Sequence, residues 1–294
     1  MFRDRTVPTP EPTPEPTDEF LWGMSYNAGE NPTSFEKRVG STVEMRRFFV
    51  PSANISPAVR AVNEDMAAGR KATQVSFKLD ATWAQAATGA SDAWARDAAR
   101  QLAAAVGNSG HLVQVAIQHE PEDDQGKNDG STVQGRDAWV AMNARLGPIF
   151  RAAGLEYGVI IMGHHSMPNA TGNKEVWLLE KWLPQLSDKI DFLGLDIYAA
   201  SNNAATFEAN YLRYIKAQTD KVGITWGLSE SAITPENFKV YPEWFENLYR
   251  LLPQYGASFY SYFNTGLNNE IGTLVMSPDD AREKAFLEVL KLEQ

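Results

Sequence analysis

The chain has 294 residues, of which 43% are hydrophobic and 22% charged, and its formal net charge is −10. The length suits one large domain or two small ones, and the composition is that of an ordinary globular protein. The acidic balance argues against nucleic acid as a partner, because such binding needs a basic surface. The sequence has no cysteine, which excludes disulfides and thiolate metal ligands.

Residues 7–17 form a short repeat of proline, threonine and glutamate, VPTPEPTPEPT. Such a run has nothing to bury and favours extended polyproline conformations. We interpret residues 1–17 as a linker or tail, through which an upstream domain or a virion tail assembly would be joined, and residues 18–294 as the folded domain. No apolar run suits a signal peptide or membrane insertion, and we expect an extracellular or virion-associated protein.

Strand-like and helix-like segments alternate along the rest of the chain. Most strand candidates are continuous apolar runs, as expected for parallel strands covered on both faces. The expected strands are 20–26, 42–50, 73–79, 112–118, 157–162, 192–198, 224–229 and 258–263. The expected helices are 32–39, 56–69, 91–107, 132–154, 175–187, 206–221, 242–252 and 278–290.

Eight strands alternating with about eight helices predict an α/β fold, a single-domain (β/α)8 TIM barrel. A doubly wound open sheet is the alternative, but it normally has a glycine-rich phosphate turn after its first strand. The segment after the first strand here, from Trp22 to Glu30, lacks that glycine spacing.

Two of the apolar runs stop at a carboxylate, LVQVAIQHE at Glu120 and VGITWGLSE at Glu230. An unpaired carboxylate at the end of a buried strand costs far more free energy than an apolar residue there. In a barrel of this kind the chemistry lies at the carboxyl ends of the strands, so we expect the two acids to face each other across one site. A pair of facing carboxyl groups is the equipment of a glycoside hydrolase.

Three short motifs carry a resemblance to a known family. They are His119-Glu120 on the fourth strand, GLDIY ending at Tyr198 on the sixth and GLSE ending at Glu230 on the seventh. This pattern resembles the clan A glycoside hydrolases, most closely glycoside hydrolase family 26. The resemblance implies a retaining mechanism on a polysaccharide backbone, with Glu120 as general acid/base and Glu230 as nucleophile. The proline-rich start and the alanine-rich helices also resemble proteins of actinobacteria or their phages.

Other residues at the strand ends could support these two acids. Tyr198 could donate its hydroxyl to Glu230 and keep it ionised, or it could be a core tyrosine. Neighbouring strand residues face opposite ways, so either Arg46 or Arg47 can point inward, and we favour Arg47 as the cation near Glu230.

Several residues are open to two interpretations. His119 could bind the nucleophile or a sugar hydroxyl, or it could be a core histidine. Asp196 could be a sugar ligand or a structural acceptor. Further candidates for contact with a sugar are His164, His165, Asn264, Trp22, Trp83 and Trp226. We expect neither a metal nor a cofactor, since the His164-His165 pair lacks ligand spacing with a carboxylate.

Two other classes of function compete with a glycosidase. A carbohydrate-binding barrel without turnover, such as a phage tail or cell-surface adhesion domain, would bind the same polysaccharide or cell-wall glycan but needs neither acid. A different barrel enzyme is the third possibility. An aldolase needs a strand-end lysine, for which Lys78 alone qualifies, and a barrel metallohydrolase needs a His-x-His on the first strand, which is absent.

Overall fold

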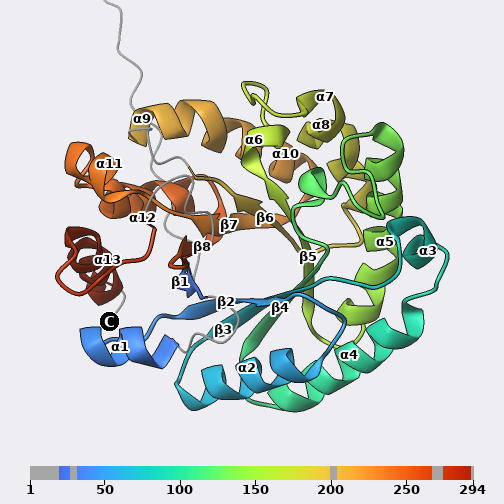
Figure 1. Cartoon of the computed structure of the whole chain (residues 1–294), viewed down its shortest axis with the longest axis horizontal. Helices are drawn as coiled ribbons and strands as arrows, with labels where there is room; N and C mark the ends of the chain where they lie inside the picture. Colours follow the sequence, from blue (N-terminus) through green and yellow to red (C-terminus); the bar gives the residue numbers. More distant parts are fainter. Residues whose placement is uncertain (1–19, 27–31, 199–203, 267–273, 293–294) are drawn as a thin grey trace, which may run out of the picture.

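A computed structural model describes residues 20–26, 32–198, 204–266 and 274–292. These residues form a closed barrel in which eight parallel strands follow one another in sequence order, with helices around the outside (Figure 1). The predicted (β/α)8 barrel is confirmed. Residues 1–17 lie outside the described part, so their role as a linker stays a prediction.

Every expected strand is present, with ends that differ by a few residues. The strands are β1 (Leu21–Ser25), β2 (Met45–Val50), β3 (Ala72–Phe77), β4 (Leu112–Ile117), β5 (Glu156–Met162), β6 (Phe192–Asp196), β7 (Thr225–Ser231) and β8 (Ala257–Phe263).

The inside of the barrel is packed at its amino-terminal end and polar at its carboxyl end. A cluster of inward apolar side chains fills the amino-terminal part of the interior. Its members are Leu21, Met45, Ala72, Ala116, Ile160, Phe192 and Phe259. The two phenylalanine rings fit because glycines lie beside them: a Cβ on Gly158 would come 2.5 Å from the Phe192 ring, and one on Gly227 would come 2.5 Å from Phe259. The packed amino-terminal layer leaves the carboxyl end as the place for polar side chains.

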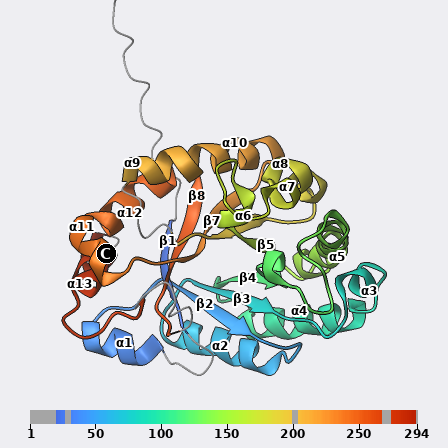
Figure 2. The ribbon, with the colours of Figure 1, turned by 45° about the horizontal axis from the view of Figure 1, so that its top comes forward.

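Helices cover the outer face of the barrel in both views (Figures 1 and 2). The longer ones are α1 (Pro32–Val39), α2 (Ser56–Ala67), α4 (Asp92–Val106), α5 (Val133–Arg151), α10 (Arg213–Val222), α12 (Trp244–Gln254) and α13 (Ala281–Leu292). The shorter ones are α3 (Trp83–Ala87), α6 (Gly163–Ser166), α7 (Lys174–Trp177), α8 (Leu179–Trp182), α9 (Ala204–Phe207) and α11 (Pro235–Val240). None of the described helices is long and apolar enough to cross a bilayer.

The structure corrects the helix predictions in three ways. Short helices were missed, among them α3, whose start carries a capping box in which Thr82 and Gln85 satisfy each other's backbone amides. The expected single helix over 175–187 is divided into α7, α8 and a 3₁₀ segment (Leu183–Leu186), because Leu178 is extended at ψ 131° and Pro184 follows. The expected helix over 206–221 contains a π-helical turn (Glu208–Leu212) before α10.

Candidate active site

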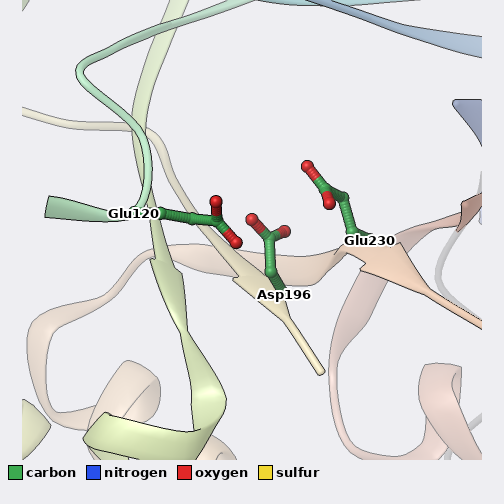
Figure 3. A group of neighbouring side chains, drawn as sticks. All are labelled: Glu120, Asp196 and Glu230. Atoms are coloured by element: carbon green, nitrogen blue, oxygen red, sulfur yellow. The ribbon is translucent and has the colours of Figure 1, made fainter. Parts of the chain in front are cut away.

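Three carboxylates meet at the carboxyl end of the barrel. Glu120 follows β4, Asp196 ends β6, and Glu230 lies near the end of β7. One oxygen atom from each of the three lies within 4.8 Å of the others, and Figure 3 shows Asp196 between the two glutamates. The sequence predicted the meeting of Glu120 and Glu230, but left Asp196 undecided between a sugar ligand and a structural acceptor.

The backbone after β4 has an unusual conformation that turns Glu120 towards the other acids. Gln118 and Glu120 have φ values of 54° and 51°, in the left-handed region that non-glycine residues rarely adopt. Hydrogen bonds hold this turn on both sides. The indole of Trp139 donates to the carbonyl of Gln118 at 2.9 Å, and the ammonium of Lys78 donates to that of His119 at 2.7 Å. Such strain at a polar site is typical of functional residues.

A register shift places Asp196 directly beside Glu230. Along β6 and β7, Leu195 pairs with Leu228, and the next residue, Asp196, pairs with Glu230. The extra residue on β7 is a bulge, a feature that commonly redirects a side chain next to an active site. Both oxygens of Asp196 are buried, and its side chain forms a hydrogen bond with that of Glu120, which lowers the pKa of Glu120.

Glu230 has two partners that favour its ionised form. The hydroxyl of Tyr198 donates to Oε2 of Glu230 at 2.6 Å, and Nη2 of Arg47 lies 3.9 Å from Oε1. Arg47 faces into the barrel and stacks over the Phe49 ring, whereas Arg46 faces outward and pairs with Asp65. Arg47 is therefore the arginine of this pair that faces inward and lies near Glu230.

Glu120 raises the pKa of Glu230, and both glutamates raise the pKa of Asp196. Burial, followed by the charge of Glu120, raises the pKa of Glu230 to about 8, while Arg47 and Tyr198 oppose the shift. Burial raises the pKa of Glu120, and Lys78 and Arg47 oppose that shift. Burial and both glutamates hold the pKa of Asp196 well above its usual range. The cluster therefore retains protons at neutral pH, as closely spaced carboxyl groups do.

A chain of hydrogen bonds connects Arg47 with His119. Nη1 of Arg47 donates to Oγ of Ser76 at 2.8 Å, and the same oxygen lies 3.0 Å from Nδ1 of His119. Burial is the main cause that holds the pKa of His119 well below its usual range, followed by the charges of Lys78 and Arg47. His119 is therefore a neutral, hydrogen-bonded side chain beside Glu120, and not a backbone-satisfied core histidine.

A groove of about 450 Å³ opens beside Glu120. Its charged lining residues are Lys78, Asp80, Glu120, Asp123, Asp124 and Lys127. Two larger hollows, of about 540 and 660 Å³, are lined by other residues, among them Lys71 and Gly69 before β3, at the amino-terminal end of the barrel. The groove beside Glu120 is the hollow that adjoins the carboxylate cluster.

Three expected tryptophan contacts with a sugar are wrong. Trp22 is fully buried and stacks on Tyr260 with ring centroids 4.1 Å apart, in the layer between the barrel and the helices. Trp226 is 1% exposed, and its indole donates to the carbonyl of Tyr255. Trp83 is also 1% exposed, within α3. A ring whose faces are covered by other side chains cannot stack on a sugar.

The remaining candidates lie around the mouth without touching the three acids. Oδ1 of Asn264 accepts a hydrogen bond from the amide of Met276, so it holds the segment that follows β8. His164 and His165 lie on α6. His164 is exposed, and Nδ1 of His165 accepts from the amide of Asn173 at 2.7 Å. Contact of either histidine with a sugar stays a prediction.

Ser76 and the buried Glu122 are two further residues near the site, and neither was among the candidates predicted from the sequence. Ser76 is an inward residue of β3, two positions before Lys78, and strand alternation would have found it. Glu122 lies in the acidic segment after Glu120, yet it is 3% exposed and its Oε1 accepts from the amide of Met162. Burial holds the pKa of Glu122 well above its usual range.

Three carboxylate oxygens at this spacing are a donor set that hard cations such as Ca²⁺ and Mg²⁺ use. Arg47 and Lys78 already supply positive charge to Glu230 and Glu120. The protein's own cations therefore already offset part of the negative charge of the cluster.

The fold is shared with several solved glycoside hydrolases, at low sequence identity. A family 26 β-mannanase from Bacteroides ovatus has a TM-score of 0.60 and 14% identity, over 92% of this chain and 88% of that one. A fungal β-1,4-galactanase has a TM-score of 0.61 and 11% identity, over 90% and 93%. A family 5 enzyme from Prevotella bryantii, solved with a xyloglucan oligosaccharide, has a TM-score of 0.57 and 12% identity, over 88% and 86%.

No protein-family model matches the sequence, and no curated protein is similar to it at a significant level. At such identities the solved structures establish the barrel fold alone. The chemistry must be argued from the site.

Proposed function

We propose that the chain is a retaining O-glycosyl hydrolase that cleaves the backbone of a polysaccharide. The observation that carries this proposal is the approach of Glu120 and Glu230, with one oxygen of each within 4.8 Å of the other. Retaining glycosidases have carboxyl groups about 5–5.5 Å apart, whereas inverting enzymes need about 6.5–9.5 Å to fit a water molecule. The close approach of the two carboxylates supports the retaining spacing.

The roles of the two acids follow from their surroundings. Glu230 receives the Tyr198 hydroxyl and lies near Arg47, both of which favour its carboxylate, so it is the nucleophile. Glu120 has a pKa raised by burial and adjoins the groove, so it is the general acid/base. Its proton passes to the leaving oxygen as Glu230 attacks the anomeric carbon. Glu120 then takes a proton from the water that releases the sugar from Glu230.

The pKa shifts within the cluster are consistent with these roles of the two glutamates. The charge of Glu120 is the second cause that raises the pKa of Glu230. When Glu120 is protonated, as the first step requires, that repulsion is absent and Glu230 ionises more easily. Asp196, whose pKa is raised by burial and by both glutamates, is the third member of the cluster.

We further propose a polysaccharide or cell-wall glycan as substrate, attacked within the chain, without a cofactor or metal. The solved structures that share the fold are named as enzymes of β-mannan and β-1,4-galactan or are bound to xyloglucan. We therefore place β-linked backbones first. The segment 1–17 would connect the barrel to an upstream domain or a virion tail, outside the cell.

The direct test is release of reducing ends from a panel of β-linked polysaccharides, including bacterial cell-wall glycans. The wild type should release them, and Glu120→Gln and Glu230→Gln should not. Glu156→Gln, which changes a carboxylate at the start of β5 and the opposite end of the barrel, is the matched control and should keep activity. Binding of a glycan without any release would favour the alternative, a non-catalytic carbohydrate-binding barrel.

A further inference from the structure

We infer that Ser76 fixes the tautomer of His119, so that the ring hydrogen lies on Nε2 and Nε2 is an N–H donor. Ser76 is then a positioning residue for the reaction, acting through His119. This inference deepens the proposed function, on which its kinetic consequence rests. The tautomer itself rests only on hydrogen-bond geometry.

Arg47 determines how the hydroxyl of Ser76 is oriented. A guanidinium has only donors, so the 2.8 Å bond between Nη1 of Arg47 and Oγ of Ser76 must use a lone pair of the hydroxyl. The hydroxyl hydrogen of Ser76 is then left to find an acceptor of its own. Arg47 is fully buried and cannot lose its charge to reverse this order.

Only one acceptor is available for that hydrogen. Ser76 is fully buried, and within the described part of the chain its Oγ bonds only to Arg47 and to Nδ1 of His119, at 3.0 Å. If Nδ1 carried a hydrogen, the hydroxyl hydrogen of Ser76 would be buried without an acceptor, which proteins strongly avoid. Nδ1 of His119 is therefore the acceptor, and the ring hydrogen lies on Nε2.

The other ring nitrogen faces a different environment. His119 is only partly buried, and its Nε2 has no hydrogen-bond partner among the residues that the structure describes. The ring lies against Phe49, with centroids 5.5 Å apart, beside the αL turn that carries Glu120. A neutral imidazole in this tautomer can donate to a sugar oxygen but cannot remove a proton from one through Nδ1. His119 is thus a binding group and not a second base.

The protein contains an internal reference for a protonated Nδ1. Nδ1 of His111 lies 2.9 Å from the backbone carbonyl of Arg70, and a carbonyl can only accept. His111 must therefore carry a hydrogen on Nδ1, where we infer that His119 carries none. The two states give clearly different ¹⁵N signals in one spectrum of the four histidines.

The test is an ¹H–¹⁵N multiple-bond correlation spectrum of histidine-labelled full-length protein, with His119 assigned by its loss in His119→Gln. We expect a bare Nδ1 and a protonated Nε2 for His119 in the wild type, and a mixture of tautomers in Ser76→Ala. Ser261→Ala removes another buried inward hydroxyl, paired with Ser25 at 2.9 Å, and should leave His119 unchanged. A protonated Nδ1 in the wild type, or an unchanged tautomer in Ser76→Ala, overturns the inference.

The kinetic consequence gives a second measurement that tests the role of Ser76. Ser76→Ala should lower kcat/KM about tenfold, the value of one hydrogen bond to a ligand, whereas Ser261→Ala should not. An equal loss in both variants would show a merely structural role. The spectrum needs no substrate, so it decides the tautomer even if the wild type hydrolyses no glycan. Absence of hydrolysis would overturn the proposed function alone.

Discussion

The hydroxyl of Tyr198, just after β6, donates a 2.6 Å hydrogen bond to Oε2 of Glu230 on β7. A bond to an ionised acceptor is stronger than one to a neutral group, so this contact favours the carboxylate. It opposes burial and the charge of Glu120, which raise the pKa of Glu230 to about 8. A nucleophile that must be ionised depends on this contact.

Tyr198→Phe should therefore impair the reaction in a specific way. Loss of a hydrogen bond to a charged group is expected to lower kcat/KM by roughly tenfold to a hundredfold. The pKa of Glu230 should rise further, so the acidic limb of the kcat/KM profile should move to higher pH. The pH–rate profile measures both effects.

Tyr157→Phe is the matched control for this variant. It removes a buried hydroxyl that donates to Oδ1 of Asn143 at 2.7 Å, between β5 and α5. Its unfolding free energy should fall while the pH profile keeps its position. An acidic limb that does not move in Tyr198→Phe would contradict the role of the tyrosine.

Lys78 should control the alkaline limb of the pH–rate profile. Its ammonium is the largest influence that lowers the pKa of Glu120 against burial. In Lys78→Met that pKa should rise, so the general acid stays protonated to higher pH and the alkaline limb moves up. Lys127→Met removes a lysine of the same groove that bonds to the carbonyls of Leu79 and Asp80, and it should leave the limb in place. A shift of the same size in both variants would argue against a specific effect of Lys78.

The stability of the protein should depend on pH through Asp196. Its pKa is well above its usual range in the folded protein, because of burial and the two glutamates. A raised pKa stabilises the fold below the unfolded value, near pH ~4, and that contribution is lost as pH rises through the folded value. The unfolding free energy of the wild type should therefore fall with pH.

Asp196→Asn removes this titration and should flatten the curve. Its unfolding free energy should fall less than that of the wild type between about pH 5 and about pH 8, by about 1.4 kcal/mol for each unit of pKa shift. Urea unfolding at both pH values measures the difference. Parallel curves for the two proteins would show that Asp196 is already ionised in the fold.

Trp226 should matter for folding and not for substrate binding. Trp226→Phe loses a buried hydrogen bond to the carbonyl of Tyr255 and should lower the unfolding free energy by about 1–2 kcal/mol. KM for the polysaccharide should stay unchanged, since the ring is covered. A raised KM with unchanged stability would reinstate the tryptophan as a contact for sugar.

The barrel could be predicted because parallel strands covered on both faces appear as continuous apolar runs. The helices could be predicted less completely. The five residues of α3 are too short to show a helical period, and a local capping box defines that helix. The interrupted helix over α7 and α8 depends on the extended Leu178, which tertiary packing imposes.

The site could be predicted in part. Glu120 and Glu230 were evident because each ends an apolar strand with a carboxylate. The position of Asp196 depends on a register shift between β6 and β7, which no local pattern encodes. Trp22 was expected on the wrong face of β1, because an aromatic residue suits either face of a strand. The neighbouring residue Gly23 is the one that faces into the barrel.

The central claim is that Glu230 is the nucleophile and Glu120 the acid/base, and azide rescue tests it most directly. With an activated aryl glycoside, Glu120→Ala should still form the glycosyl-enzyme, and azide should release a glycosyl azide of retained configuration. Glu230→Ala should form no glycosyl-enzyme, and azide should attack directly to give the inverted azide. NMR of the two products should show these opposite configurations. The reverse pair of configurations would show that the roles are exchanged, and unchanged activity in either variant would contradict the account.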